Sequence, residues 1–242
     1  MDNVVINIKK GADRALAESV SKKIDSPIVE GLGEELTLLF DAKGVSLAGY
    51  GLTYQGDFEN MVRRVSDGRL AHEMLVRAVK TTKEHPVAID ATAGMGEDAL
   101  LIAAAGYTVT LHEQNPVIAV LLKDALRRAK KNTVLKDIVS RMKVVEGDSS
   151  LLLADYIDEV DVIYLDPMFP ARQKSGLINK KLQLIQRLEP PCTSENELFD
   201  AAISAAPGKI IVKRPLKSPN LADKKPNYVL NGKAIRYDCY TF

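Results

Sequence analysis

The feature that most constrains the fold of this chain is a regular alternation of short β-rich runs with helical segments, which begins at residue 86. Five runs follow one another: PVAID (86–90), YTVTLHE (107–113), MKVVEGD (142–148), VDVIYLD (160–166) and KIIVKRP (209–215). The segments between them have helical spacing, as in the amphipathic stretch from Pro116 to Lys131. Strands separated by helices predict βαβ units, and hence a parallel sheet with helices on both faces.

The last part of the chain departs from this alternation. YVLNGKAIRYDCYTF (228–242) holds two β-rich stretches around Asn231-Gly232, a pair typical of type I′ turns. It predicts an antiparallel hairpin that closes the sheet. We therefore expect a Rossmann-like α/β domain over residues 81–242, with a parallel sheet and a C-terminal antiparallel hairpin.

The first 80 residues show no clean alternation. The stretch from Asp13 to Lys23 favours a short helix, while Glu35 to Phe40 and residues 45–54 favour two strands. A further helical run leads from Leu70 towards Lys83. The sequence predicts a small N-terminal α+β module over residues 1–80.

Composition excludes several classes of protein. The 242 residues are 46% hydrophobic and 27% charged, which is typical of a globular chain and excludes disorder, collagen and a coiled coil. We expect no membrane span, because no run of about eighteen apolar residues occurs, and no secretory signal. Cys192 and Cys239 lie far apart and only three histidines occur, so we expect no metal site, and reduced thiols in a cytoplasmic protein.

The net charge of +1 hides an uneven distribution. Residues 86–170 carry 8 basic and 13 acidic side chains, whereas residues 171–242 carry 13 basic and 6 acidic ones. A basic final third can present a positive face to an anionic polymer such as RNA. Charge alone favours the simpler interpretation of a solvated surface.

The loop after the first run indicates a ligand site. Asp90 is followed by Gly94 and Gly96, which let the backbone turn tightly and approach a ligand, and then by Glu97 and Asp98. A phosphate-binding loop would have a third glycine or a GK[ST] sequence, and these carboxylates would repel phosphate. S-adenosylmethionine (SAM), with its ammonium and sulfonium charges, fits such a loop.

Polar residues also follow the next two runs. Glu113 is placed to accept hydrogen bonds from ribose hydroxyls, and Gln114 follows it. Asp148, Ser149 and Ser150 offer donors and acceptors for an adenine ring. Because the carboxyl ends of parallel strands lie at one edge of a sheet, we expect these residues to form one cofactor site.

The sequence Asp166-Pro167-Met168-Phe169-Pro170 follows a strongly apolar run. It resembles the (Asn/Asp)-Pro-Pro-(Tyr/Phe) motif of methyltransferases that act on exocyclic or side-chain amide nitrogens. Such a nitrogen is a poor nucleophile because its lone pair is delocalised. The Asp166 carboxylate and the Pro167 carbonyl can accept its N–H bonds, and Phe169 can stack on a base. We therefore predict that Asp166, Pro167 and Phe169 are the catalytic residues.

Taken in order, the segments DATAGMGEDA, HEQNPVIAVLL, VIYLDPMFP and VKRP resemble the RsmJ family over about residues 60 to 242. This resemblance implies a class I methyltransferase fold and a cytoplasmic, SAM-dependent enzyme that makes N2-methylguanosine near the 3′ end of 16S ribosomal RNA. The family usually has arginine where Glu97 and Gln114 stand. The binding positions that the resemblance implies are Glu97, Asp98, Glu113, Gln114, Ser149, Ser150 and Asp166.

Basic residues follow the proposed catalytic loop and the fifth run, and we expect them to hold RNA phosphates while the target base is unstacked. They are Arg172, Lys174, Lys180, Lys181, Lys213 and Arg214. The partner would be small-subunit ribosomal RNA, either free or within the assembled subunit.

Three alternatives remain open on the residues alone. The Asp-Pro motif also permits methylation of another amino nitrogen, such as adenine N6, a different guanine or a protein glutamine amide. An NAD-dependent dehydrogenase would suit Glu113, but it conflicts with the missing third glycine, the acidic loop and the terminal hairpin. A non-catalytic RNA-binding assembly factor could retain the same fold.

Overall fold

The structure is a computed structural model, and it describes residues 4–31, 33, 35–66, 68–156, 159–167, 180–188 and 195–242. The chain forms two compact units, each made from several stretches of sequence. Among the described residues, the first unit takes those up to 57 together with 115–128 and 180–188. The second unit takes 58–114, 129–167 and 195–242.

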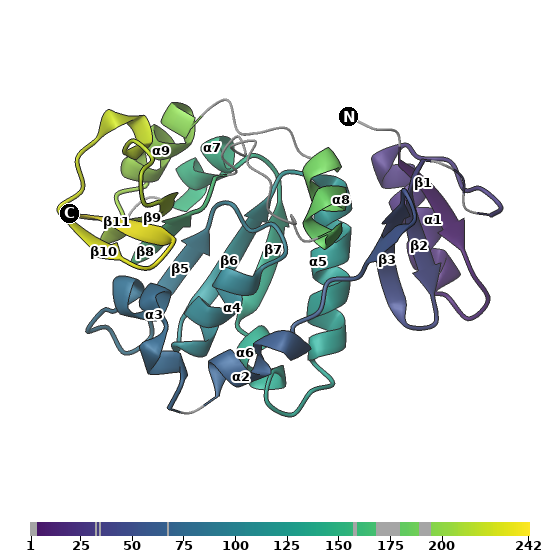
Figure 1. Cartoon of the computed structure of the whole chain (residues 1–242), viewed down its shortest axis with the longest axis horizontal. Helices are drawn as coiled ribbons and strands as arrows, with labels where there is room; N and C mark the ends of the chain where they lie inside the picture. Colours follow the sequence, from purple (N-terminus) through teal and green to yellow (C-terminus); the bar gives the residue numbers. More distant parts are fainter. Residues whose placement is uncertain are drawn as a thin grey trace. The chain divides into compact units, whose positions relative to one another are not determined.

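The first unit contains a four-stranded sheet in the order β1-β2-β3-β4 (Figure 1). Its strands are β1 (Val4–Ile8), β2 (Leu36–Asp41), β3 (Gly44–Gly49) and β4 (Leu52–Tyr54). Strand β1 pairs with β2 in parallel, and the remaining pairs are antiparallel. Helix α1 (Arg14–Ile24) is capped at its N-terminus by Asp13, whose side chain accepts the backbone N–H of Leu16. The helix buries Ala17 and Val20.

Two helices from later in the sequence belong to the same unit: α5 (Pro116–Ala129), except for its last residue, and α8 (Lys180–Leu188). The buried Asp124 of α5 accepts the N–H of Val45 in β3 at 3.0 Å. Asn115 caps α5, since its Oδ1 accepts the N–H of Val117 at 2.9 Å. Its amide nitrogen donates to the carbonyl of Leu188 at 3.0 Å, so one side chain joins α5 to α8.

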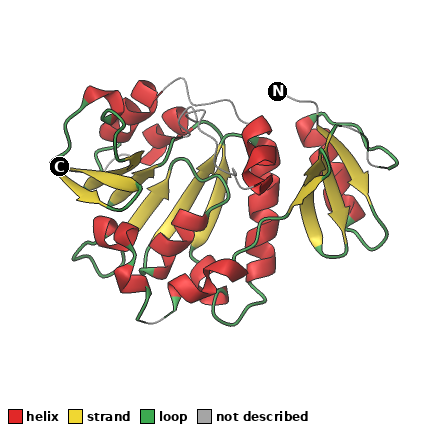
Figure 2. Cartoon of the chain, viewed as in Figure 1, coloured by secondary structure: helices red, strands yellow, loops and turns green. Residues whose placement is uncertain are grey.

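The second unit is built on a seven-stranded sheet in the order β10-β11-β9-β8-β5-β6-β7, drawn in yellow in Figure 2. Its strands are β5 (Val87–Asp90), β6 (Thr108–Glu113), β7 (Met142–Glu146), β8 (Val162–Leu165), β9 (Lys209–Pro215), β10 (Tyr228–Asn231) and β11 (Ile235–Thr241). Strands β5 to β9 are parallel to one another, whereas β11 runs antiparallel to both β9 and β10. The chain reverses its direction of winding between β5 and β8, the place where open α/β sheets bind ligands.

Helices lie on both faces of this sheet. The hydroxyl of Tyr164 in β8 reaches α4, whereas its neighbours Ile163 and Leu165 pack in the same core cluster as Phe199 of α9. Because side chains alternate between the faces of a strand, α4 and α9 cover opposite faces. The helices of this unit are α2 (Val62–Val65), α3 (Met74–Val79), α4 (Glu97–Ala104), α6 (Lys136–Val139), α7 (Ser149–Leu152) and α9 (Glu195–Ser204). Short 3₁₀ turns span Glu59–Met61, Leu70–His72, Leu153–Tyr156 and Leu221–Asp223.

The predicted fold class is confirmed, including the parallel sheet and the C-terminal antiparallel hairpin. The turn type was wrong, because Asn231 pairs with Arg236 and neither Asn231 nor Gly232 has the positive φ that a type I′ turn requires. Strand β1 was missed, and residues 45–54 form parts of two strands rather than one.

The domain boundary at residue 80 stays a prediction. The four-stranded sheet lies within residues 4–54, and the second unit begins at Phe58. Within the described part of the chain, the helices are all too short or too polar to span a bilayer.

Candidate active site

The loop between β5 and α4 forms the first part of the site. Gly94 has a φ of 51° and Gly96 a φ of 75°, a left-handed conformation that glycine adopts without steric cost. Gly96 is also the N-cap residue of α4, which begins at Glu97. A Cβ atom at Gly94 would meet nothing within 4 Å, so there is open space beside this backbone. The loop therefore has room for a ligand to approach its main chain.

Side chains from two strand ends and the loop itself hold this loop in place. Glu113, buried at the end of β6, accepts the N–H of Gly94 on its Oε2 at 2.9 Å. Asp90, buried at the end of β5, accepts the N–H of Thr92 at 3.1 Å. The Thr92 hydroxyl in turn accepts the N–H of Asp166 at 2.7 Å. The predicted cofactor loop and the predicted catalytic loop are thus directly connected.

A single ammonium group joins two of the carboxylates. The Nζ atom of Lys213 lies 2.8 Å from Asp98 Oδ2 and 2.8 Å from Asp166 Oδ2. The Tyr164 hydroxyl donates to the same Asp98 oxygen at 2.6 Å. These four residues come from α4, β8, the turn after β8, and β9, so they converge at the carboxyl end of the sheet.

Burial and nearby negative charge raise the pKa values of two carboxylic acids at this edge, Asp90 and Asp166. Burial raises the pKa of Asp90 to about 8, and the neighbouring carboxylates Asp98 and Asp166 add to the effect. Burial also raises the pKa of Asp166, while the ammonium of Lys213 opposes that rise. Because Asp98 and Asp166 share one ammonium, this edge favours a ligand that carries positive charge.

Several predicted cofactor residues lie at the same sheet edge with different degrees of exposure. Glu97, Gln114 and Asp148 are exposed. Ser149 is buried, and its hydroxyl donates to the carbonyl of Ala91 at 2.6 Å, so it holds the start of the loop that follows β5. Asp148 caps α7 by accepting both the N–H and the hydroxyl of Ser150, at 2.9 and 2.7 Å.

The remaining predicted residues fall into two groups. Pro167 is buried after the end of β8. Phe169, Arg172 and Lys174 lie outside the described residues, and Lys180 and Lys181 begin α8 with side chains that also lie outside them. Their roles stay predictions.

Arg214 was assigned to RNA phosphates, and its geometry contradicts this. Its side chain is 3% exposed, donates twice to the carbonyl of Pro219 and pairs with Glu195 at 3.2 Å. We therefore withdraw Arg214 from the predicted phosphate contacts. Lys213 was assigned the same role, but both of its contacts are carboxylates at the site.

Sequence reasoning missed the roles of Thr92 and Tyr164. Tyr164 is 1% exposed, as a core residue would be, yet its hydroxyl contacts Asp98. For Lys213 the sequence did hold a signal, since this lysine directly follows the apolar run KIIV. An ammonium at the end of a buried strand needs a carboxylate partner.

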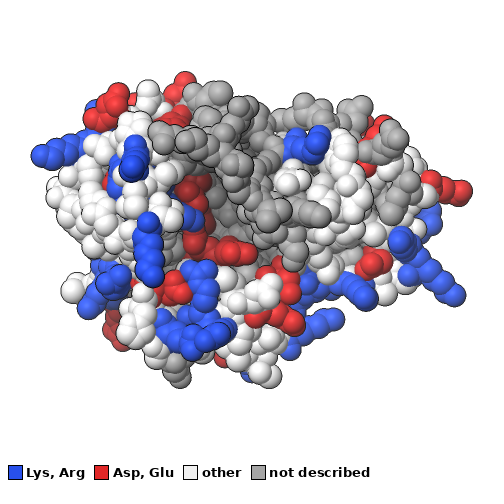
Figure 3. Space-filling model, viewed as in Figure 1, with Lys and Arg blue, Asp and Glu red and all other residues white. Residues whose placement is uncertain are grey.

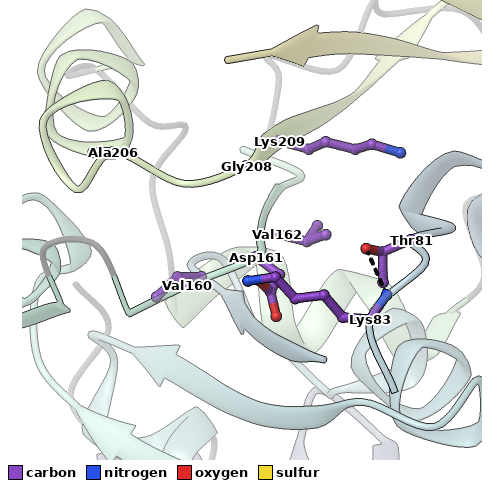
Figure 4. A pocket seen from close by; sticks show the side chains of 8 residues that line it. All are labelled: Thr81, Lys83, Val160, Asp161, Val162, Ala206, Gly208 and Lys209. Atoms are coloured by element: carbon purple, nitrogen blue, oxygen red, sulfur yellow. Dashed lines mark hydrogen bonds and ion pairs between the residues drawn. The ribbon is translucent and has the colours of Figure 1, made fainter. Parts of the chain in front are cut away.

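A different cavity lies at the opposite, amino-terminal edge of the same sheet (Figure 4). It has a volume of about 230 Å³, and its lining includes Lys83, Asp161, Gly208 and Lys209. No residue of the carboxyl-edge cluster lines it. On the face drawn in Figure 3, basic and acidic side chains are interspersed over the surface.

Comparison with known proteins identifies the family. A model of the SAM-dependent methyltransferase family matches residues 51–242. The chain is 36% identical over 255 residues to ribosomal RNA small subunit methyltransferase J of Thioalkalivibrio sulfidiphilus, a match that covers 99% of each chain. The chain belongs to this family. The relative of the same name from Pseudomonas aeruginosa is 40% identical over 170 residues, which is 69% of this chain and 65% of that relative.

A solved structure shows that the family fold extends along the chain. The crystal structure of a SAM-dependent methyltransferase from Neisseria gonorrhoeae matches with a TM-score of 0.78 and 29% identity. The match covers 98% of this chain and 95% of that one. The chain is thus a SAM-dependent methyltransferase of class I architecture, as its motifs predicted.

The residues of the carboxyl edge fit this cofactor. The open space beside Gly94 admits a ligand, and the surrounding carboxylates favour its cationic groups. Glu113 offers acceptor oxygens at the strand end where such folds bind a ribose. Within the described residues, no cluster of three or more His, Cys, Asp or Glu side chains is arranged to hold a metal ion.

Proposed function

We propose that this chain transfers the methyl group of SAM to the exocyclic N2 amine of one guanosine in small-subunit ribosomal RNA. The observation that carries the proposal is the position of Asp166 directly after β8, where its backbone N–H donates to the Thr92 hydroxyl of the cofactor loop. The names of the curated relatives support the ribosomal RNA substrate, and the family resemblance supplies the guanine N2 atom.

The cofactor would be held by the groups at the carboxyl edge. The backbone of the Gly94–Gly96 loop would contact the methionine part of the cofactor. The Glu113 carboxylate would contact its ribose, and the Asp148–Ser150 turn would contact its adenine ring. Asp90, Asp98 and the exposed Glu97 and Gln114 complete the predicted set. Bound there, SAM supplies a methyl group attached to a positively charged sulfur, and the nearby carboxylates favour that charge.

The chain's contribution to the reaction is mainly one of positioning. The Asp166 carboxylate and the carbonyl of Pro167 accept the two N–H bonds of the guanine amine, so that its lone pair is aimed at the methyl donor. Phe169 stacks on the base. With the donor and the base bound, the new N–C bond would form as the S–C bond breaks, S-adenosylhomocysteine would leave, and the methylated amine would release one proton to water.

RNA would be held through its phosphates by Arg172, Lys174, Lys180 and Lys181, which follow the catalytic loop. Such contacts determine affinity without reading the base sequence, and they weaken as salt increases. The substrate is the ribosomal RNA of the small subunit in the cytoplasm, either free or assembled.

The test uses radiolabelled SAM, this protein and small ribosomal subunits from cells that lack the homologous enzyme. The label is traced to a nucleoside, with Asp166→Ala assayed in parallel. We expect label in N2-methylguanosine, lost in the variant. Label in N6-methyladenosine, or in protein, would replace the proposed substrate, and tight RNA binding without any label would indicate a non-catalytic factor.

A further inference from the structure

Lys213 holds together the two loops on which the proposed reaction depends. One of its partners, Asp98, is in the first turn of α4, directly after the cofactor loop, and the other, Asp166, directly follows β8. Both Nζ–Oδ2 distances are 2.8 Å, and only 24% of the lysine side chain is exposed. A lysine that binds RNA phosphates would extend into solvent, whereas the ammonium of Lys213 is paired with two carboxylates of the site.

The pairing of the strands explains why Lys213 reaches Asp166. Strands β8 and β9 are parallel neighbours, and Leu165 lies opposite Val212. The next residues along the two strands are Asp166 and Lys213. Their proximity is therefore set by the register of the sheet and does not depend on the conformation of a long loop.

The end of β9 is itself held firmly. Arg236, in the neighbouring β11, pairs with the fully buried Asp238 at 2.7 Å. Its guanidinium also donates to the carbonyl of Pro215, the last residue of β9, and to those of Leu216 and Ser218 in the loop that follows. Arg214 binds the same loop at the carbonyl of Pro219. The strand end that carries Lys213 is thus fixed from the side away from the site.

We propose that Lys213 is a positioning residue for methyl transfer: its ammonium fixes the Asp166 carboxylate against Asp98 and so sets the acceptor for the substrate amine. This inference rests on the proposed function. Without the ammonium, Asp98 and Asp166 would repel each other across the site, and the Asp166 carboxylate would lose the partner that fixes its direction. It would also lose the charge that opposes the rise of its pKa caused by burial.

The experiment compares Lys213→Met, Lys213→Arg and a control, Lys209→Met, which removes a lysine from the other end of the same strand. Steady-state kcat and KM for ribosomal RNA are measured between pH 5 and 9. We expect Lys213→Met to lower kcat roughly 10- to 100-fold with little change in KM, because a misplaced acceptor weakens the chemical step. Its acid limb should move to higher pH, because the pKa of Asp166 rises further without the ammonium.

The other two variants sharpen the result. Lys213→Arg keeps the charge but has a different donor geometry, so we expect the wild-type acid limb with a partial loss of kcat. Lys209→Met should leave kcat, KM and the pH profile unchanged. A rise in KM together with a weaker salt dependence for Lys213→Met, with kcat intact, would instead assign Lys213 to phosphate and overturn the inference.

A second measurement does not require RNA. The pKa of Asp166 is followed by carbon-13 NMR of the aspartate carboxyls, with the signal assigned by Asp166→Asn. We expect a higher Asp166 pKa in Lys213→Met than in the wild type, and an equal value would overturn the inference. Failure of the wild type to methylate ribosomal RNA would refute the proposed function and leave this titration as an independent test.

Discussion

The two ends of the same pair of strands use the same residue types for different purposes. Asp161 immediately precedes β8 and Asp166 immediately follows it, while β9 begins at Lys209 and has Lys213 near its other end. Each edge of the sheet therefore brings aspartate and lysine side chains together. What differs is how completely their charges are matched within the protein.

At the amino edge the charges have structural partners. Asp161 accepts the N–H of Val87 at 2.8 Å with one oxygen and pairs with Lys83 through the other. Figure 4 shows Lys83 extending to this aspartate. Lys209 donates to the carbonyl of Lys80 at 2.6 Å. These contacts attach the segment before β5 to the sheet.

At the carboxyl edge, acids outnumber bases. Asp98 and Asp166 share the ammonium of Lys213, and the pKa of the neighbouring Asp90 is raised by burial. Two carboxylates that share one ammonium are suited to a ligand that carries positive charge. The comparison shows that this shared ammonium beside the cofactor loop, more than the presence of ion pairs, distinguishes the site from the supporting structure.

The largest expected effect comes from replacing Asp166 and Asp161 by alanine in two separate variants. Asp166→Ala should lower kcat by roughly 100-fold or more while the melting temperature stays close to that of the wild type. Asp161→Ala should leave the rate per folded molecule within about twofold of the wild type, but it removes the partner of the Val87 amide and should lower stability by about 1–3 kcal/mol. Methyl transfer and thermal unfolding are measured on both. Equal loss of rate in both variants would remove the distinction between the edges.

The next effect concerns affinity for the cofactor. Glu113→Ala removes an acceptor at the ribose position and the partner of the Gly94 amide, and it should weaken SAM binding by roughly 10- to 100-fold. Isothermal titration calorimetry gives the Kd. Glu84→Gln, an exposed change beside the amino edge, is the matched control and should leave the Kd unchanged. Unaltered binding in Glu113→Ala would place the ribose elsewhere.

The smallest effect is a pH dependence of stability. Burial raises the pKa of Asp90 from 3.8 to about 8, so between these values the folded chain holds a proton that the unfolded chain has released. Folding then takes up a proton, and this group's contribution to stability falls as pH rises through that window. Asp90→Asn should remove the slope, so the melting temperature of the wild type should fall relative to that of the variant by roughly 8 °C between pH 5 and 8.

A control for this slope is Asp200→Asn, a change at an exposed position of α9. Its melting temperature should follow that of the wild type at every pH. Parallel curves for the wild type and Asp90→Asn would show that Asp90 is ionised in the folded chain. That result would mean the carboxyl edge carries more negative charge than we infer.

Much of the second unit was predictable because its signals are local. Short apolar runs such as VDVIYL, followed by an acid and a proline, identify buried parallel strands with a functional turn at the end. The acidic Gly94–Gly96 loop and Glu113 were found for the same reason, since the residue types and spacing lie within a few turns of chain.

The features that were missed depend on pairing between distant segments. Nothing near Lys213 in the sequence indicates that β9 lies beside β8, so the lysine was taken for a phosphate ligand. The burial of Arg214 likewise depends on Glu195 and on the loop that ends at Pro219. Strand β1 is parallel to β2, a pairing that leaves no hairpin signal.

The make-up of the first unit has a consequence for how such a protein can be divided. Its β-sheet comes from the start of the chain, but α5 and α8 are contributed by two later stretches. The units are therefore interleaved in the gene and cannot be exchanged as independent modules by recombination at one boundary. A fragment that begins at residue 58 would lack Val45, and of the contacts described for the buried Asp124 of α5 it would retain those with Arg127 and Arg128.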